Sequence, residues 1–222
     1  MRSSLLPGLF FLALLNITIG CHTVETQPVA SGTPLQDLLD GNARFAAMHS
    51  LHPHESKKRM AEIAAAQHPF AVVVCCSDSR VPPEIIFDQG LGDLFVVRTA
   101  GNLMGALEIG SIEYAVEHLG VKQVVIMGHR ECGAIKAFTS GAEAPGHIRD
   151  IVDSIKAEQE IRQLPADDKN LFNDCIRANI LHGIHQLRNQ SPLLEEKYRK
   201  GELQLIGSCY DLQKGLVEII TE

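Results

Sequence analysis

The segment that most constrains the fold is residues 70–83, FAVVVCCSDSRVPP. Its apolar, β-branched run from Ala71 to Val74 predicts a strand that is buried on both faces. Because side chains two residues apart share a face of a strand, Cys76, Asp78 and Arg80 can project the same way where this strand ends. That end is the usual ligand position in an open α/β sheet. The simpler alternative is a core cysteine followed by a turn with an ordinary Asp–Arg ion pair.

The next hundred residues alternate between strand and helix patterns. A second buried run covers Leu94 to Val97, and a helix is predicted over Ala106 to Leu119, with Gly120 as its C-terminal cap. A third strand is predicted over Val121 to Met127. Strand, crossover helix and strand in this order indicate a parallel sheet.

The remaining segments extend this pattern on both sides. Apolar spacing predicts two N-terminal helices and two C-terminal helices, followed by two more strands, the last of them at an edge of the sheet. The predicted ranges are 34–46, 56–66, 148–164 and 168–189 for the helices and 203–208 and 216–220 for the strands. The fold class is therefore α/β, with a mainly parallel sheet flanked by helices.

A second pair of possible ligands follows the third strand. His129 and Cys132 have the spacing H-x-x-C. If the first and third strands are neighbours, these residues meet Cys76 and Asp78 at one edge of the sheet. Two thiolates, an imidazole and a carboxylate favour zinc over calcium or magnesium. Three firm ligands, with a fourth position for Asp78 or water, are typical of a catalytic rather than a structural zinc site.

Several other classes of function are disfavoured. The net charge of −7, without a basic cluster, argues against a nucleic acid partner. The redox motif C-x-x-C is absent, as are the P-loop and the nucleophile elbow. His182 and His185 lie one turn apart in a predicted helix and could bind a metal, but without a third ligand nearby packing or solvent contact is the favoured interpretation.

The N-terminus has the pattern of an export signal. Residues 9–15, LFFLALL, are an apolar core of the length found in secretory signals and too short to span a bilayer. Thr18 to Cys21 resembles a bacterial lipobox, although the lipobox pattern prefers Leu where Thr18 stands. We therefore expect a signal peptide over 1–21, a polar tether over 22–32 and a single domain over 33–222. The protein would then be exported to the periplasm or cell envelope, either anchored by a lipid on Cys21 or simply cleaved.

The paired motifs resemble one family over most of the chain. C-S-D-S-R at 76–80 together with H-x-x-C at 129–132 is similar to the β-class carbonic anhydrases. The likeness runs from about Thr33 to Ile220 and includes GDLFVVRTAGN at 92–102, SIEYAVEHLG at 111–120, GHRECGAI at 128–135 and YDLQKG at 210–215.

This resemblance implies a sheet of four parallel strands plus one antiparallel edge strand, and dimers or tetramers of the chain. It implies one Zn²⁺ per subunit, held by Cys76, His129 and Cys132. Asp78 would either accept a hydrogen bond from water at the zinc or bind the metal itself in a closed form. Arg80 would pair with Asp78 and hold it away from the metal.

The resemblance also implies a small substrate pocket for CO₂ and bicarbonate. Gln67 stands where the family places an amide that can bond a substrate oxygen, and Phe95 and Tyr114 match lining positions. Zinc would acidify water to hydroxide, which attacks the carbon of CO₂ to give bicarbonate and a proton. Two alternatives stay open: a related zinc hydrolase acting on CS₂ or COS, and a zinc-binding protein without turnover.

Two positions differ from the pattern of many family members. Thr99 stands where many have Asn, and Val73 stands where some bacterial members have a Trp linked to an inhibitory bicarbonate site. The chain has no Trp at all, so we do not expect that form of regulation.

Overall fold

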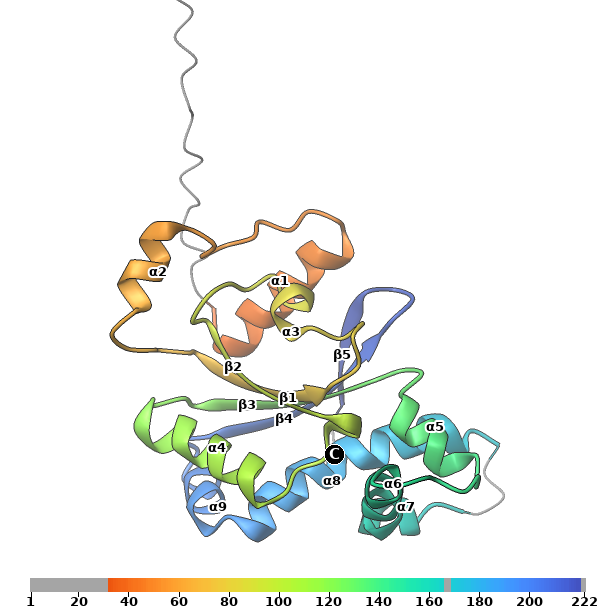
Figure 1. Ribbon diagram of the computed structural model, residues 1–222. Coiled ribbons are helices and arrows are strands. Elements are labelled where there is room, and N and C mark those ends of the chain that lie inside the picture. Colours follow the sequence, from red (N-terminus) through yellow and green to blue (C-terminus); the bar gives the residue numbers. More distant parts are fainter. Residues whose placement is uncertain (1–31, 166–168, 221–222) are drawn as a thin grey trace, which may run out of the picture.

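The computed structural model describes residues 32–165 and 169–220 and contains one five-stranded sheet within these residues (Figure 1). Its strand order is β2-β1-β3-β4-β5, with parallel pairing between the first four and antiparallel pairing between β4 and β5. The strands are β1 (Ala71–Cys76), β2 (Leu94–Thr99), β3 (Gln123–His129), β4 (Gln204–Asp211) and β5 (Leu216–Ile220). The predicted fold class, including the antiparallel edge strand, is confirmed.

Helices cover both faces of the sheet. Figure 1 shows α1, α2 and α3 on one face and α4 to α9 on the other. The helices are α1 (Pro34–Ala46), α2 (Lys57–Ile63), α3 (Pro83–Ile86), η1 (Ala100–Asn102), α4 (Ala106–His118), α5 (Gly133–Thr139), α6 (Ile148–Ala157), α7 (Gln159–Arg162), α8 (Leu171–Gln190) and α9 (Pro192–Arg199).

Strand β1 lies inside the sheet, where it pairs with β2 on one side and β3 on the other. All six of its residues are buried. Val72 and Val74 face the cluster under α4 and α8, whereas Val73 and Cys75 face the cluster under α1 and α3. Cys76 belongs to a third apolar cluster with Cys132 and Ile135. The neighbouring cysteines 75 and 76 therefore face opposite sides, as the alternation of a strand requires.

The N-terminal helix begins where its capping residues predict. Thr33 accepts a hydrogen bond from the Gln36 amide at 3.3 Å, and Pro34 is the first helical residue. The expected signal peptide and nearly all of the tether lie outside the described residues. Within the described residues, no helix is both long enough and apolar enough to cross a membrane.

Three C-terminal features differ from the predicted elements. The helix predicted over 148–164 is interrupted at Glu158, whose ψ of 129° is extended rather than helical. Helices α5 and α9 were not predicted. α5 has seven residues and α9 eight, so each spans about two turns, which is too short for a clear apolar period to emerge from the sequence.

Candidate metal centre

Three donor side chains converge at the carboxyl edge of the sheet. Cys76 ends β1, His129 ends the adjacent parallel strand β3, and Cys132 is the residue before α5. One ligand atom from each lies within 4.8 Å of the other two, and all three residues are buried. Within the described residues this is the one group of three or more possible ligands that meets that spacing. The predicted convergence is confirmed.

The backbone fixes the orientation of the imidazole. The Arg130 amide donates to the Tyr210 carbonyl at 2.9 Å, which ties the turn after β3 to β4. His129 Nδ1 lies 2.9 Å from the Arg130 carbonyl oxygen and donates to it, so Nε2 carries the lone pair. His129 Nε2 is buried without a hydrogen-bond partner. A metal-binding histidine has this arrangement, with its second nitrogen fixed by a backbone oxygen.

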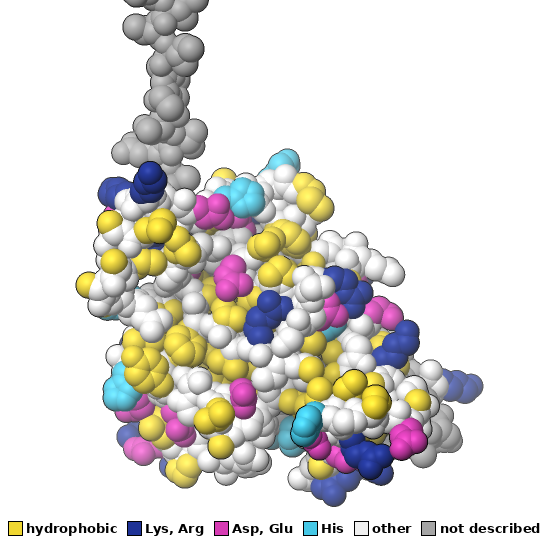
Figure 2. Space-filling view, viewed as in Figure 1, with side chains coloured by type: hydrophobic (Ala, Val, Ile, Leu, Met, Phe, Trp, Pro, Cys, Tyr) yellow, Lys and Arg dark blue, Asp and Glu magenta, His cyan; other side chains and the backbone are white. Residues whose placement is uncertain are grey.

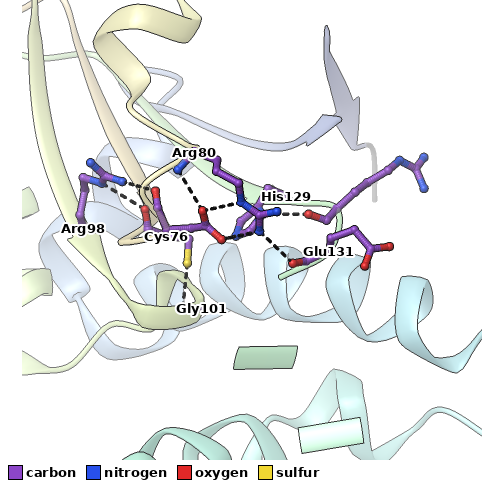
Figure 3. Close-up of polar contacts among 8 residues, drawn as sticks. Cys76, Arg80, Arg98, Gly101, His129 and Glu131 are labelled. Atoms are coloured by element: carbon purple, nitrogen blue, oxygen red, sulfur yellow. Dashed lines mark hydrogen bonds and ion pairs between the residues drawn. The ribbon is translucent and has the colours of Figure 1, made fainter. Parts of the chain in front are cut away.

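The two thiols affect each other's proton affinity in opposite directions. A hydrogen bond from Cys132 to Cys76 lowers the pKa of the Cys76 thiol and raises that of Cys132. The Gly101 amide adds a second hydrogen bond to Cys76 Sγ at 3.3 Å (Figure 3). Both sulfurs, together with the imidazole of His129, would be available to hold a divalent cation. Two thiolates and an imidazole form the soft donor set that zinc prefers, so the residues present fit this metal.

Asp78 lies beside the donor set and is held by Arg80. Arg80 Nε and Nη2 donate to Asp78 Oδ1 and Oδ2 at 2.9 and 2.7 Å, and the Arg80 amide donates to Oδ1 at 2.9 Å. The hydrogen bonds from Arg80 hold the pKa of Asp78 well below its usual range. Asp78 Oδ2 lies 4.0 Å from His129 Nε2. The carboxylate is therefore ionised, close to the donors and restrained from moving onto them.

Arg80 also connects the two ligand loops. Its Nη2 reaches the carbonyl oxygen of Glu131 at 3.4 Å. Glu131, between His129 and Cys132, has a φ of +55°, a strained conformation for a residue other than glycine. The guanidinium thus stabilises the turn that carries two donors as well as the carboxylate beside the third.

Arg98 is a site residue that the sequence analysis missed. From β2 its Nε donates to the Cys76 carbonyl at 3.1 Å and its Nη2 to the Asp78 carbonyl at 2.7 Å. Figure 3 shows Arg98 and Arg80 on opposite sides of the loop that follows Cys76. The sequence signal for Arg98 was a charged residue at the end of an apolar run, but its partners depend on the register that pairs it with Cys75.

The three residues expected to line a substrate pocket lie in two surface depressions. Gln67 and Tyr114 line one of about 550 Å³, together with His68 and His118. Phe95 lines another of about 210 Å³, beside Arg98 and Leu107. Neither depression, as lined by described residues, includes Cys76, His129 or Cys132. One chain therefore joins Gln67 with Tyr114 but brings neither to the metal ligands.

The histidine pair on α8 contacts an acid from α7. His182 Nδ1 and His185 Nδ1 each lie 2.6 Å from an oxygen of Glu160. The premise that no further ligand lies near these histidines is therefore wrong, but the three side chains do not meet the metal-site spacing found for Cys76, His129 and Cys132, and their contact attaches α7 to α8.

Comparison with known proteins gives a consistent result. The family model for carbonic anhydrase matches residues 71–217. The chain is 39% identical to a carbonic anhydrase of Mycolicibacterium smegmatis, over 88% of this chain and 94% of that one. It is 38% identical to carbonic anhydrase 2 of Mycobacterium tuberculosis, over 86% and 92%.

Solved structures agree with these sequence relatives. The β-carbonic anhydrase CafA of Aspergillus fumigatus matches with a TM-score of 0.64 and 29% identity, over 84% of this chain and 90% of that one. A tetrameric β-carbonic anhydrase of Sordaria macrospora matches with a TM-score of 0.66 and 25% identity, over 86% and 98%. The chain therefore belongs to the carbonic anhydrase family and is a β-class enzyme of carbon dioxide hydration.

Proposed function

We propose that Asp78 and Arg80 are the catalytic pair of this carbonic anhydrase, acting beside one zinc per subunit held by Cys76, His129 and Cys132. The observation that carries the proposal is the position of an ionised, clamped carboxylate 4.0 Å from the unpartnered nitrogen of His129. A closed structural zinc site needs four protein ligands and no such restraint. The dyad therefore favours an enzyme over a protein that only stores or binds zinc.

The side chains of Asp78 and Arg80 would position the hydrogen bonds and charges around the zinc ligands. Zinc in this site would act as a Lewis acid that lowers the pKa of water, which gives a hydroxide nucleophile for CO₂. Asp78, as an ionised acceptor beside the zinc ligands, would accept a hydrogen bond from the attacking water and set its orientation toward the substrate. Arg80 keeps Asp78 ionised and prevents it from becoming a fourth ligand. Because two thiolates neutralise the formal charge of the metal, we expect activity to climb from neutral to alkaline pH.

A stopped-flow assay tests this function directly. The protein should hydrate CO₂, lose the activity after treatment with a zinc chelator and regain it when zinc is returned. Parallel assays with CS₂ and COS address the alternative substrates. Turnover of CS₂ or COS without CO₂ hydration would replace our proposal, and zinc binding without any turnover would refute it.

We further propose that the protein is exported. The support is the apolar run over 9–15 followed by the lipobox-like Thr18 to Cys21. Cell fractionation should find a processed protein in the envelope, and Cys21→Ala should release it from the membrane if Cys21 carries the lipid. A membrane-free processed form of the parent would indicate an ordinary cleaved signal, whereas a cytoplasmic product that retains Met1 would contradict export.

Assembly into dimers or tetramers is a third proposal. Its support is that Gln67 and Tyr114 do not reach the metal ligands within one chain, so a second copy would have to complete the substrate pocket. Leu107 and Tyr114 on α4 are 83% and 47% exposed, and Figure 2 shows hydrophobic side chains gathered on one face. Light scattering of the full, unprocessed chain should give a mass that is a multiple of 24.3 kDa. A fully active monomer would contradict the proposal.

A further inference from the structure

A second carboxyl group is buried in the protein, on the side of the metal ligands away from Asp78. Glu158 stands between α6 and α7 and is only 2% exposed. Ile155 and Ile161, three residues before and after it in the chain, belong to the same apolar cluster as Cys76 and Cys132. A glutamate in such surroundings is rare unless it is paired, and the zinc chemistry described above does not use it.

Two buried asparagines connect Glu158 with the ligand region. Asn179 of α8 donates from Nδ2 to Glu158 Oε1 at 2.8 Å. Asn102 of η1 donates from Nδ2 to Asn179 Oδ1 at 2.7 Å. Both asparagines are 3% exposed. The three side chains therefore form one continuous buried relay from the α6–α7 junction to the loop that follows β2.

The far end of this relay contacts a metal ligand through the backbone. Gly101, which precedes Asn102, donates its amide to Cys76 Sγ at 3.3 Å. Gly101 and Asn102 both have left-handed backbone conformations, with φ values of +67° and +47°. Glycine adopts this conformation freely, whereas a residue such as Asn102 keeps it where the surroundings hold it in place. The Asn102 side chain, bonded to Asn179, supplies that restraint.

The chemistry of Glu158 indicates a neutral acid. Its Oε2 is buried without a hydrogen-bond partner, and an ionised carboxylate with one unpaired oxygen would be costly there. Burial and, to a smaller extent, the negative charge of Glu160 raise the pKa of Glu158 to about 8, while the Asn179 hydrogen bond partly opposes them. The proton thus belongs on Oε2, and Oε1 accepts from Asn179.

We propose that Glu158, as a neutral carboxylic acid, is a positioning residue that acts through Asn179 and Asn102 to hold the Gly101 amide against the Cys76 sulfur. The proposal rests on the function proposed above for Cys76 as a zinc ligand. An N–H donor on a thiolate withdraws charge from the sulfur and leaves more positive charge on a bound metal. Loss of the relay should therefore weaken the acidifying effect of the site.

The first experiment compares Glu158→Gln with Glu158→Leu. Gln keeps an acceptor for Asn179 without a charge, so its activity and metal spectrum should match the parent. Leu removes the acceptor, and activity should fall by about 10-fold to 100-fold, as is usual for residues that support metal ligands. The pH–activity midpoint of the Leu variant should also move to higher pH.

The cobalt-substituted protein provides a readout that does not depend on turnover. The thiolate-to-cobalt absorption band should shift in Glu158→Leu and stay unchanged in Glu158→Gln. Asn102→Gly keeps the left-handed backbone but removes the relay side chain, so it should shift the band in the same way. This variant provides the test if Glu158→Leu does not fold. Ile161→Ala, a change in the same apolar cluster, is the matched control and should alter stability alone. A parental band in both the Leu and Gly variants would overturn the proposal.

The protonation state has a separate test in the pH dependence of stability. The unfolded chain releases the Glu158 proton near the ordinary glutamate pKa of 4.5, whereas the folded protein keeps it to about pH 8. The parent should therefore lose stability relative to Glu158→Gln as pH rises through this window. If the difference is constant from pH 5 to 9, Glu158 is not a retained neutral acid. This outcome would refute our proposal without affecting the assignment of CO₂ hydration.

Discussion

Two carboxyl groups flank the metal ligands and have opposite environments. Asp78 is partly exposed and accepts three hydrogen bonds from Arg80, which lower its pKa. Glu158 is buried, accepts a hydrogen bond from Asn179, and has its pKa raised to about 8. At neutral pH the first is therefore a fixed negative charge and the second a neutral acid.

This difference shows how one residue class serves two purposes around a single site. The carboxylate of Asp78, on the solvent side, can accept a hydrogen bond during the reaction, and Arg80 stabilises its negative charge. A negative charge on Glu158 would face the apolar cluster around Cys76 and Cys132. Among the described groups that shift the pKa of Glu158 there is no cation to stabilise that charge. Environment, rather than residue type, assigns the roles.

Replacement of a shared ligand should have the largest effect. Cys132→Ser removes one of the two thiolates on which both carboxyl roles depend, so zinc and activity should be lost together. Metal analysis of the purified variant, beside a Cys175→Ser control at a buried cysteine outside the donor group, tests this. Full zinc in Cys132→Ser would contradict the assignment of Cys132 as a ligand, and with it the placing of the two carboxyl groups on either side of this donor set.

Replacement of the outer carboxyl should cost activity but not metal. Asp78→Ala should retain zinc and lose about 10²-fold to 10³-fold in rate, the usual effect of removing one positioned hydrogen-bonding group. Stopped-flow rates and zinc content from the same preparation separate these effects. A variant as fast as the parent would mean that Asp78 and Arg80 form only a surface ion pair.

Removal of the restraint should have a smaller effect on rate, of about 10-fold to 100-fold. Arg80→Ala should keep zinc but free Asp78 to occupy the fourth position, which favours a closed and inactive form. The cobalt spectrum should then indicate four protein ligands, and the double variant with Asp78→Ala should lose that signature. If the Arg80→Ala spectrum remains parental, Arg80 does not hold Asp78 off the metal.

The sequence predicted the fold and the outer half of the site because their signals are local. Cys76, Asp78 and Arg80 follow one strand, and His129 and Cys132 follow another, so parallel pairing was enough to bring them together. Arg98 could not be assigned in this way. Its bonds to the Cys76 and Asp78 carbonyls follow from the β1–β2 register, which the residue pattern does not determine.

The inner half of the site was hidden for a related reason. The spacing of apolar residues over 148–164 predicts an unbroken helix, in which Glu158 would be one more surface acid. At the break, Glu158 is buried and accepts a hydrogen bond from Asn179 of α8, a tertiary contact that local spacing does not reveal. The relay also joins Asn102, Glu158 and Asn179 across up to 77 positions of the chain, a relation that appears only in three dimensions.

The smallest expected effect sharpens the comparison at the inner carboxyl. Glu160, two residues from Glu158, raises the pKa of Glu158 through its negative charge and is itself held ionised by His182 and His185. Glu160→Gln should therefore lower the pKa of Glu158, by less than about one unit. The neutral acid would then be lost at a lower pH.

Infrared difference spectra can follow this change, because the carboxylic acid band of Glu158 is absent in Glu158→Gln and can be assigned by subtraction. The band should disappear at lower pH in Glu160→Gln than in the parent. Glu196→Gln, which removes an exposed acid of α9 that pairs with Lys200, should leave the band unchanged. The Asp78 side of the site should also be unaffected, with parental activity near pH 6, where the inner acid is neutral in both proteins. A Glu158 band that titrates identically in the parent and in Glu160→Gln would show that desolvation and the Asn179 hydrogen bond set its proton affinity, without a contribution from the charge of Glu160.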